Sequence, residues 1–233
     1  MEKQTASDWP FKLLVAVLGI VVILTLRPYD WNASAFFHMD KNLAQGNVLP
    51  QGFVVLSVPA YDGAQYYHVA RNVPKMIDRT QWKFLRLELP PSYAYQRFLL
   101  PLTAFLLAFG QTAFLPYSFL LINILSLIAT GYLVLKKVKN PLYGLALALS
   151  PAALIGLHFT LGEPLTILLL TAFLIRWDDR KKIDTIGIGL LSLLVLTREV
   201  NVLFAGLVLV FLLFKREWKQ ASLILIPILV FTL

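Results

Sequence analysis

Cysteine is absent from the 233 residues, so the chain forms no disulfide and offers no thiolate to a metal ion. Charged residues are also scarce, at 15% against the roughly 25% that is usual in soluble domains. The sequence contains neither a glycine-rich phosphate-binding loop nor a nucleophile elbow. These absences argue against a soluble thiol, P-loop or serine-nucleophile enzyme.

Apolar residues make up 58% of the chain instead. They form continuous runs that do not alternate with polar residues, which favours membrane helices over a membrane β-barrel. The chain has a formal net charge of +8. In membrane proteins such an excess of basic residues usually lies in cytoplasmic loops, so it does not indicate a nucleic-acid partner. We therefore predict an all-α, polytopic helical bundle in the lipid bilayer of the plasma membrane.

The spans are predicted from the length of the apolar runs, because a membrane helix needs about 20 apolar residues. The first run has no small-residue cleavage site after it, so we interpret it as a retained span and not as a signal peptide. The candidate spans cover residues 11–26, 98–117, 117–135, 142–157, 165–177, 183–196, 200–214 and 221–233.

Short basic clusters predict the orientation of these spans, since such clusters prefer the cytoplasm. They lie at residues 136–139, 176–182 and 215–219, and an even number of spans separates each from the next. The segments between them, at 158–163 and 197–199, are then expected to face outward.

The long segment 27–97 carries eight basic and five acidic residues, so it gives no charge signal of its own. If this segment lies outside the membrane, only one crossing fits between residue 97 and the basic cluster that starts at residue 136. That crossing is expected over residues 117–135, and residues 98–110 then form an interfacial or re-entrant helix. The alternative is a true span over 98–115, which places residues 136–139 outside.

The first interpretation predicts seven crossings, a cytoplasmic N-terminus and a single membrane domain over residues 1–233. Its parts are a first span (11–26), an outer loop with interfacial helices (27–116) and a six-span bundle (117–233).

Asp62 and Glu163 are the candidate acids on the predicted outer face. A carboxylate beside an acceptor hydroxyl can act as a general base. The simpler interpretation of Asp62 is an N-cap for a helix over residues 64–72. For Glu163 it is a helix N-terminal carboxylate that interacts favourably with the helix dipole.

Arg97 and Arg198 are the candidate phosphate ligands, because guanidinium groups match phosphate oxygens in shape and charge. Arg97 can instead be an interfacial anchor, and Arg198 can form a structural ion pair. Glu199 is adjacent to Arg198. Since adjacent residues point to different faces of a helix, we expect the two to have separate partners.

A divalent metal site is a weaker alternative. His68 and His158, with Asp62 and Glu163, are of the right residue types. Their spacing matches no common ligand motif. We therefore predict no cofactor and keep the metal site as an alternative.

Several short motifs, in order along the chain, resemble those of bacterial integral-membrane GT-C glycosyltransferases, which are related to the mannosyltransferases of GPI-anchor assembly. Asn123 also falls where this family often has an asparagine. The matching stretches are Tyr61-Asp62-Gly63-Ala64-Gln65-Tyr66-Tyr67-His68-Val69-Ala70, Tyr93-Ala94-Tyr95-Gln96-Arg97-Phe98-Leu99-Leu100-Pro101, Gly162-Glu163-Pro164-Leu165 and Leu196-Thr197-Arg198-Glu199. Gln96 and Glu163 stand where the family has arginine and aspartate.

The resemblance implies a GT-C-like fold and inverting transfer of a hexose, such as mannose. The donor would be a polyprenyl-phosphate sugar, and the acceptor a hydroxyl on the extracytoplasmic face. It implies that Asp62 is the catalytic base and Glu163 a second acid, with Arg97 and Arg198 holding the lipid phosphate. We expect four further residues to bind substrate: Tyr66, His68, Tyr95 and Glu199.

The sequence stops at Leu233 within an apolar run, whereas members of this family continue for several spans. We therefore expect a catalytic module whose further spans are absent or belong to a partner subunit or a longer chain. Two other functions stay open: a non-catalytic module that binds a polyprenyl lipid or a scaffold partner, and a small transporter. A transporter typically has inverted repeats and ionisable groups at mid-membrane, and neither is evident here.

Overall fold

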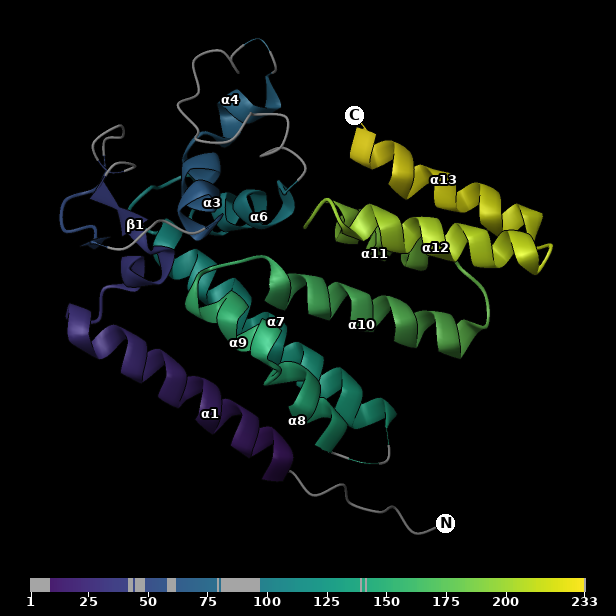
Figure 1. The fold of residues 1–233 in the computed structure, drawn as a ribbon, viewed down its shortest axis with the longest axis horizontal. Helices are drawn as coiled ribbons and strands as arrows, with labels where there is room; N and C mark the ends of the chain where they lie inside the picture. The colour runs from purple at the N-terminus through teal and green to yellow at the C-terminus, as the bar shows by residue number, and fades with distance from the viewer. Residues whose placement is uncertain are drawn as a thin grey trace.

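The computed structural model describes residues 9–41, 44, 49–57, 62–78, 80, 97–138, 140 and 142–232. Within these ranges the chain is mostly helical, which confirms the all-α class. One short parallel pair joins β1 (Met39–Asp40) to β2 (Val55–Leu56). Figure 1 shows α3 (Asp62–Arg71), α4 (Val73–Ile77), α6 (Leu99–Leu107) and β1 gathered at one end of α1 (Trp9–Leu26) and α7 (Leu115–Lys137). Three helices are stacked side by side: α11 (Thr185–Val195), α12 (Asn201–Phe214) and α13 (Trp218–Thr232).

Two described stretches are long and apolar enough to cross a membrane. The first is α1 (Trp9–Leu26) with the 3-10 turn η1 (Arg27–Tyr29), and the second is α7 (Leu115–Lys137). By length and composition alone this is weak evidence for a membrane protein.

The helices of the C-terminal half match the predicted runs closely in position but are shorter than a straight crossing. Thr185–Val195, Asn201–Phe214 and the apolar part of the last helix are apolar yet have fewer than 18 residues. The helix α10 is the exception, with 18 residues; Glu163 lies in its first turn and its other charged residues lie in the last turns. The bounds are α10 (Glu163–Arg180), α11 (Thr185–Val195), α12 (Asn201–Phe214) and α13 (Trp218–Thr232).

The predicted span over residues 142–157 is two helices, α8 (Leu142–Ala148) and α9 (Pro151–His158). Ser150 caps the second helix, with its hydroxyl oxygen accepting from the backbone N–H of Ala153 at 3.3 Å. Proline has no N–H to continue the preceding helix, but it is well suited to a first turn. The Ser-Pro pair therefore ends one helix and starts the next.

The described parts of the predicted outer loop contain short helices: η2 (Ala33–Phe37), α3 (Asp62–Arg71) and α4 (Val73–Ile77). An aromatic core attaches them to the start of α7. The ring of Phe37 lies 5.3 Å from that of Tyr67 and 5.2 Å from that of Phe119, centroid to centroid. These side chains are fully buried, so the loop is packed against the bundle as a layer.

The segment after Arg97 forms only a short helix, α6 (Leu99–Leu107). Nine residues of α-helix extend about 13–14 Å, less than half of a hydrocarbon core of about 30 Å. Phe109 and Gly110 then take positive φ angles of 51° and 73° and turn the chain before α7 begins. A continuous span over residues 98–115 is therefore not formed, and that alternative is wrong.

The basic clusters meet at one end of the helices. Lys137, at the end of α7, forms ion pairs with Asp178 and Asp179 at the end of α10. Trp177 lies 5.7 Å from Phe211, ring to ring, which places the end of α12 there as well. The opposite end carries α3, α6 and the α9–α10 and α11–α12 loops.

Large apolar side chains cover much of the outer surface. On α12 the exposed fraction is 68% for Leu207 and 84% for Phe214, and Leu24 of α1 is similarly open. Soluble monomers rarely expose apolar patches larger than a few hundred Å². This surface is chemically suited to lipid.

Candidate functional site

An ion-pair cluster forms where three distant segments meet. Arg97, just before α6, donates from Nε and Nη2 to the two carboxylate oxygens of Glu199, both at 2.7 Å. Its third nitrogen, Nη1, donates to Asp62, the first residue of α3. One buried guanidinium therefore holds two carboxylates that are far apart in the sequence.

A second ion pair lies beside the first. Arg198 donates from Nη1 to Glu163, the first residue of α10. Arg198 and Glu199 thus have separate partners, as their adjacency in the sequence predicts. The α11–α12 loop contributes one charge to each pair.

Tyr66 lies between the two ion pairs and is 3% exposed. A Cβ on Gly162 would lie 3.5 Å from the Tyr66 hydroxyl and 3.9 Å from Cγ of Arg198, so the phenol reaches the second pair. Burial raises the pKa of Tyr66 above its ordinary value, although the charge of Arg97 acts in the opposite direction. The hydroxyl is therefore neutral and can donate a hydrogen bond.

The N-terminus of α3 is held by close backbone contact. A Cβ on Gly63 would lie only 2.1 Å from the carbonyl oxygen of Phe159, which no side chain can tolerate. Gly63 therefore allows α3 to lie against the α9–α10 loop. This contact brings Asp62 close to the segment that carries Glu163.

The α11–α12 loop is held by buried hydroxyl and amide groups. Thr197 donates to the carbonyl of Leu194 at 2.6 Å and accepts from Thr166 and Asn201, both at 2.8 Å. The N–H of Leu99 donates to the carbonyl of Leu196 at 3.0 Å. The segments carrying Arg97 and Glu199 are thereby joined through backbone as well as side chains.

The cluster is open on one side. The Asp62 side chain is 42% exposed, whereas that of Arg97 is 6% exposed. Burial opposes ionisation of Arg97, but the hydrogen bonds to Glu199 and the nearby carboxylates raise its pKa, so it stays charged. Asp62 is therefore the carboxylate that a ligand reaches first.

Two atoms of the second pair remain unsatisfied within the described part of the chain. Nε of Arg198 and Oε2 of Glu163 are buried without a hydrogen-bond partner there. One is a charged donor and the other an acceptor, so the pair can bind a group that both accepts and donates, such as a phosphosugar.

Six of the eight predicted site residues come together in this cluster: Asp62, Tyr66, Arg97, Glu163, Arg198 and Glu199. Asp62 was predicted as the cap that precedes a helix, but it is the first helical residue of α3. Its carboxylate contacts a guanidinium, which goes beyond a capping role.

His68 does not join the cluster. It follows Asp62 by six residues in α3, about one and two-thirds turns, so it points to another face, whereas Tyr66 at i+4 shares the face of Asp62. His68 is fully buried beside Tyr67, and burial lowers its pKa to about 4. Tyr95 lies outside the described residues.

The alternative metal site is not assembled. Among the described residues no three histidine, aspartate or glutamate side chains are grouped closely enough to hold a metal ion. His158 packs instead against His38, with ring centroids 5.0 Å apart. That histidine pair was not predicted, because nothing in the sequence links residues 38 and 158.

Sequence reasoning also missed the residues that position the charges. Thr197 and Asn201 are four apart, a spacing that can indicate a shared hydrogen bond at a helix start. Gly63 lies in one of the matching motifs, but the sequence does not show why glycine is needed there, since the need arises from a contact with a distant segment.

Comparison of the chain with known protein families, curated proteins and solved structures found no match.

Proposed function

We propose that the chain is a membrane glycosyltransferase of GT-C type that transfers a hexose, mannose-like, from a polyprenyl-phosphate donor to a hydroxyl acceptor on the extracytoplasmic face. The observation that carries the proposal is the convergence of Asp62, Glu163 and Glu199 with Arg97 and Arg198 from four separate segments. Three carboxylates and two guanidiniums around one tyrosine form a costly arrangement for purely structural purposes, because each charge must be desolvated.

The position of the cluster supports an outer-face site. It lies at the end of the bundle opposite the lysine-rich ends of α7, α10 and α12. Basic clusters favour the cytoplasm, so the carboxylates face outward if the bundle crosses the membrane. On this basis the chain has about seven crossings, with α6 and the loop helices at the outer interface and the N-terminus inside.

In the proposed reaction the acceptor hydroxyl lies against Asp62, the most accessible carboxylate of the cluster. As the hydroxyl oxygen forms its bond to the anomeric carbon, its proton passes to the Asp62 carboxylate. The bond between the anomeric carbon and the phosphate oxygen breaks at the same time, and polyprenyl phosphate leaves with the electron pair. Attack opposite to the leaving group inverts the anomeric centre.

The arginines are suited to the leaving phosphate, since fixed cations stabilise the charge that develops in the transition state. Arg198 has an unused Nε–H, whereas Arg97 uses its nitrogens on Glu199 and Asp62. We therefore assign the phosphate chiefly to Arg198. Arg97 positions Asp62, and Tyr66 and Glu163 hydrogen-bond to the sugar.

The arrangement argues against a transporter. Glu163 begins α10, and Arg198 and Glu199 lie between α11 and α12, so the charges stand at helix ends. Transport pathways usually place ionisable groups near the middle of the membrane. The non-catalytic lipid-binding module remains the alternative that an activity assay separates.

The test is sugar transfer by the purified chain in detergent, with a polyprenyl-phosphate mannose donor and a panel of hydroxyl acceptors. Asp62→Asn should lower turnover by about 10²–10⁴-fold, the usual contribution of a general base, with donor binding largely retained. Asp30→Asn is the matched control, because it makes the same change in the same loop at an exposed position away from the cluster. Full activity of Asp62→Asn would exclude the base assignment, and donor binding without any turnover in the parent chain would favour the lipid-binding module.

A further inference from the structure

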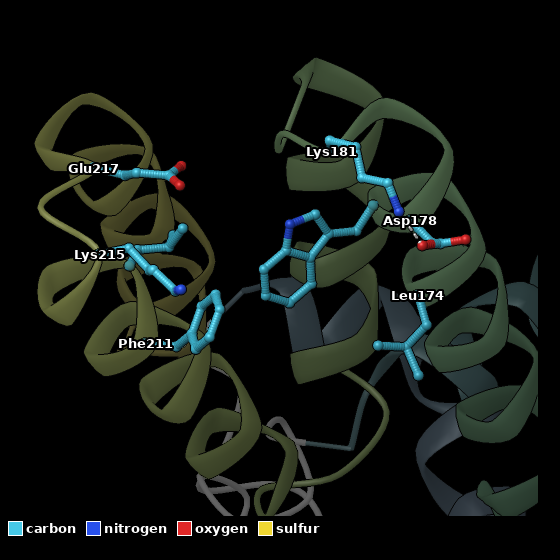
Figure 2. Close-up of a pocket in the computed structure, with 8 residues that line it drawn as sticks. Leu174, Asp178, Lys181, Phe211, Lys215 and Glu217 are labelled. Atoms are coloured by element: carbon cyan, nitrogen blue, oxygen red, sulfur yellow. Dashed lines mark hydrogen bonds and ion pairs between the residues drawn. The ribbon is translucent and has the colours of Figure 1, made fainter.

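A groove opens between the ends of α10 and α12, at the end of the molecule far from the charged cluster. Its volume is about 460 Å³. Figure 2 shows Phe211, Lys215 and Glu217 on one side and Leu174, Asp178 and Lys181 on the other. Trp177 and Leu212 complete the lining.

The inside of the groove is apolar and aromatic. The rings of Trp177 and Phe211 lie 5.7 Å apart and meet edge to face. Leu174 and Phe211 are nonetheless exposed, and the line of exposed apolar residues continues along α12 through Leu207 and Val210. This surface can hold an acyl chain along the length of the helix.

The rim of the groove carries charges of both signs, and exposed cations predominate around it. Asp178 is paired with Lys137 and Lys181, whereas Glu217 accepts from the neutral amide of Gln220 and keeps its charge. Lys215 has its Nζ 5.8 Å from the Phe211 ring and makes no ion pair with any described residue. Further exposed cations surround this end of the molecule: Arg180, Lys182, Arg216 and Lys219.

We infer that this groove binds an anionic phospholipid, with the phosphate at Lys215 and an acyl chain against Phe211 and the apolar face of α12. Charge complementarity selects the occupant, because basic pockets between helices on the cytoplasmic side attract anionic headgroups. Aromatic rings at the boundary between apolar and wet surface match the headgroup level of a bilayer. The inference rests on the membrane placement proposed above but not on the sugar chemistry.

The experiment uses a full-length variant in which every tryptophan except Trp177 is replaced by phenylalanine. Fluorescence quenching is measured in detergent with dibrominated phosphatidylglycerol and, separately, with dibrominated phosphatidylcholine. The anionic lipid should reach half-quenching at about a fivefold lower mole fraction, the size expected for one lysine near an anionic surface. Lys215→Gln should remove this preference, and Lys215→Arg should retain it.

Lys12→Gln is the matched control, because it removes one exposed lysine from the same end of the molecule but from α1. It should leave the preference unchanged. Equal quenching by the two lipids in the parent, an unchanged preference in Lys215→Gln, or an equal loss in Lys12→Gln would each overturn the site. Asp62→Asn should quench like the parent, so a failed transfer assay and a failed lipid site are told apart.

Discussion

At the scale of single residues, the candidate site depends on which guanidinium nitrogens are already engaged. Arg97 is bound to carboxylates through three nitrogens, whereas Nε of Arg198 is buried and unsatisfied within the described ranges. Two arginines that look equivalent in the sequence therefore differ in what they can offer a ligand. In the proposed reaction Arg198 is therefore the phosphate ligand, and Arg97 is the residue that positions Asp62.

Replacing Arg198 by lysine tests this difference. Lysine keeps the charge but cannot span Glu163 and a phosphate with a planar fork. We expect the KM for the donor to rise about 10–100-fold, as for the loss of a charged hydrogen bond. Steady-state kinetics at varied donor concentration measures it, with Arg180→Lys, an exposed arginine at the other end, as control. Unchanged donor kinetics would mean that Arg198 only pairs with Glu163.

His38 gives a prediction about pH. Burial, with a further contribution from His158, lowers the pKa of His38 to about 4, while the unfolded chain retains a value near 6.5. The unfolded state therefore binds the proton first, and stability present above pH 6.5 should be lost as the pH falls toward 4. His38→Asn should reduce this loss, since asparagine does not titrate and tolerates the left-handed backbone at φ 47°.

Thermal unfolding of parent and variant in detergent between pH 7.5 and 4.5 measures the effect. The two melting temperatures should converge as the pH falls. His68 also has a lowered pKa, so part of the pH dependence should persist in the variant. Parallel curves across this range would show that His38 is not responsible.

At the scale of elements, the positions of helices were predictable and their interruptions were less so. Continuous apolar runs located α1, α7 and α10 to α13 within a few residues. The break between α8 and α9 falls at a Ser-Pro pair, a cap signal that the hydropathy of the run concealed. Contacts between elements, such as that of α3 with the α9–α10 loop, leave no trace in one sequence.

Gly63→Ala tests the contact between α3 and the α9–α10 loop. The new methyl group would overlap the Phe159 carbonyl, and backbone on both sides must shift. Overpacking of this kind typically costs about 1–3 kcal/mol, and here it should also separate Asp62 from the cluster and abolish transfer. Gly189→Ala in α11 is the control, since nothing lies within 4 Å of its added methyl group. Thermal unfolding and activity are measured together, and a fully active Gly63→Ala would show that the contact is dispensable.

At the scale of the whole molecule, the two ends differ in kind. One carries the lysine-rich ends of α7, α10 and α12, and the other carries the carboxylate cluster with the loop helices. The charge pattern of the sequence predicted this separation, because an even number of apolar runs lies between successive basic clusters. The series of motifs predicted that the residues of the cluster converge. The distribution of charge along the sequence does not show which loops are in contact.

Single cysteines test the sidedness, and the absence of native cysteine makes the labelling unambiguous. The two variants are Gln111→Cys and Val138→Cys. Residue 111 lies between α6 and α7, residue 138 follows α7, and both are exposed. In sealed vesicles an impermeant maleimide should label one and spare the other until detergent is added. Labelling of both from one side would refute the proposed crossing of α7.

The pairing of Arg97 with Glu199 also has a consequence for biosynthesis. Arg97 emerges from the ribosome long before the α11–α12 loop, so its two hydrogen bonds to Glu199 form only late in synthesis. Removal of one partner from a buried charge pair typically costs about 3–5 kcal/mol of stability. A chain truncated just before residue 199 should consequently be degraded faster than one ending just after it.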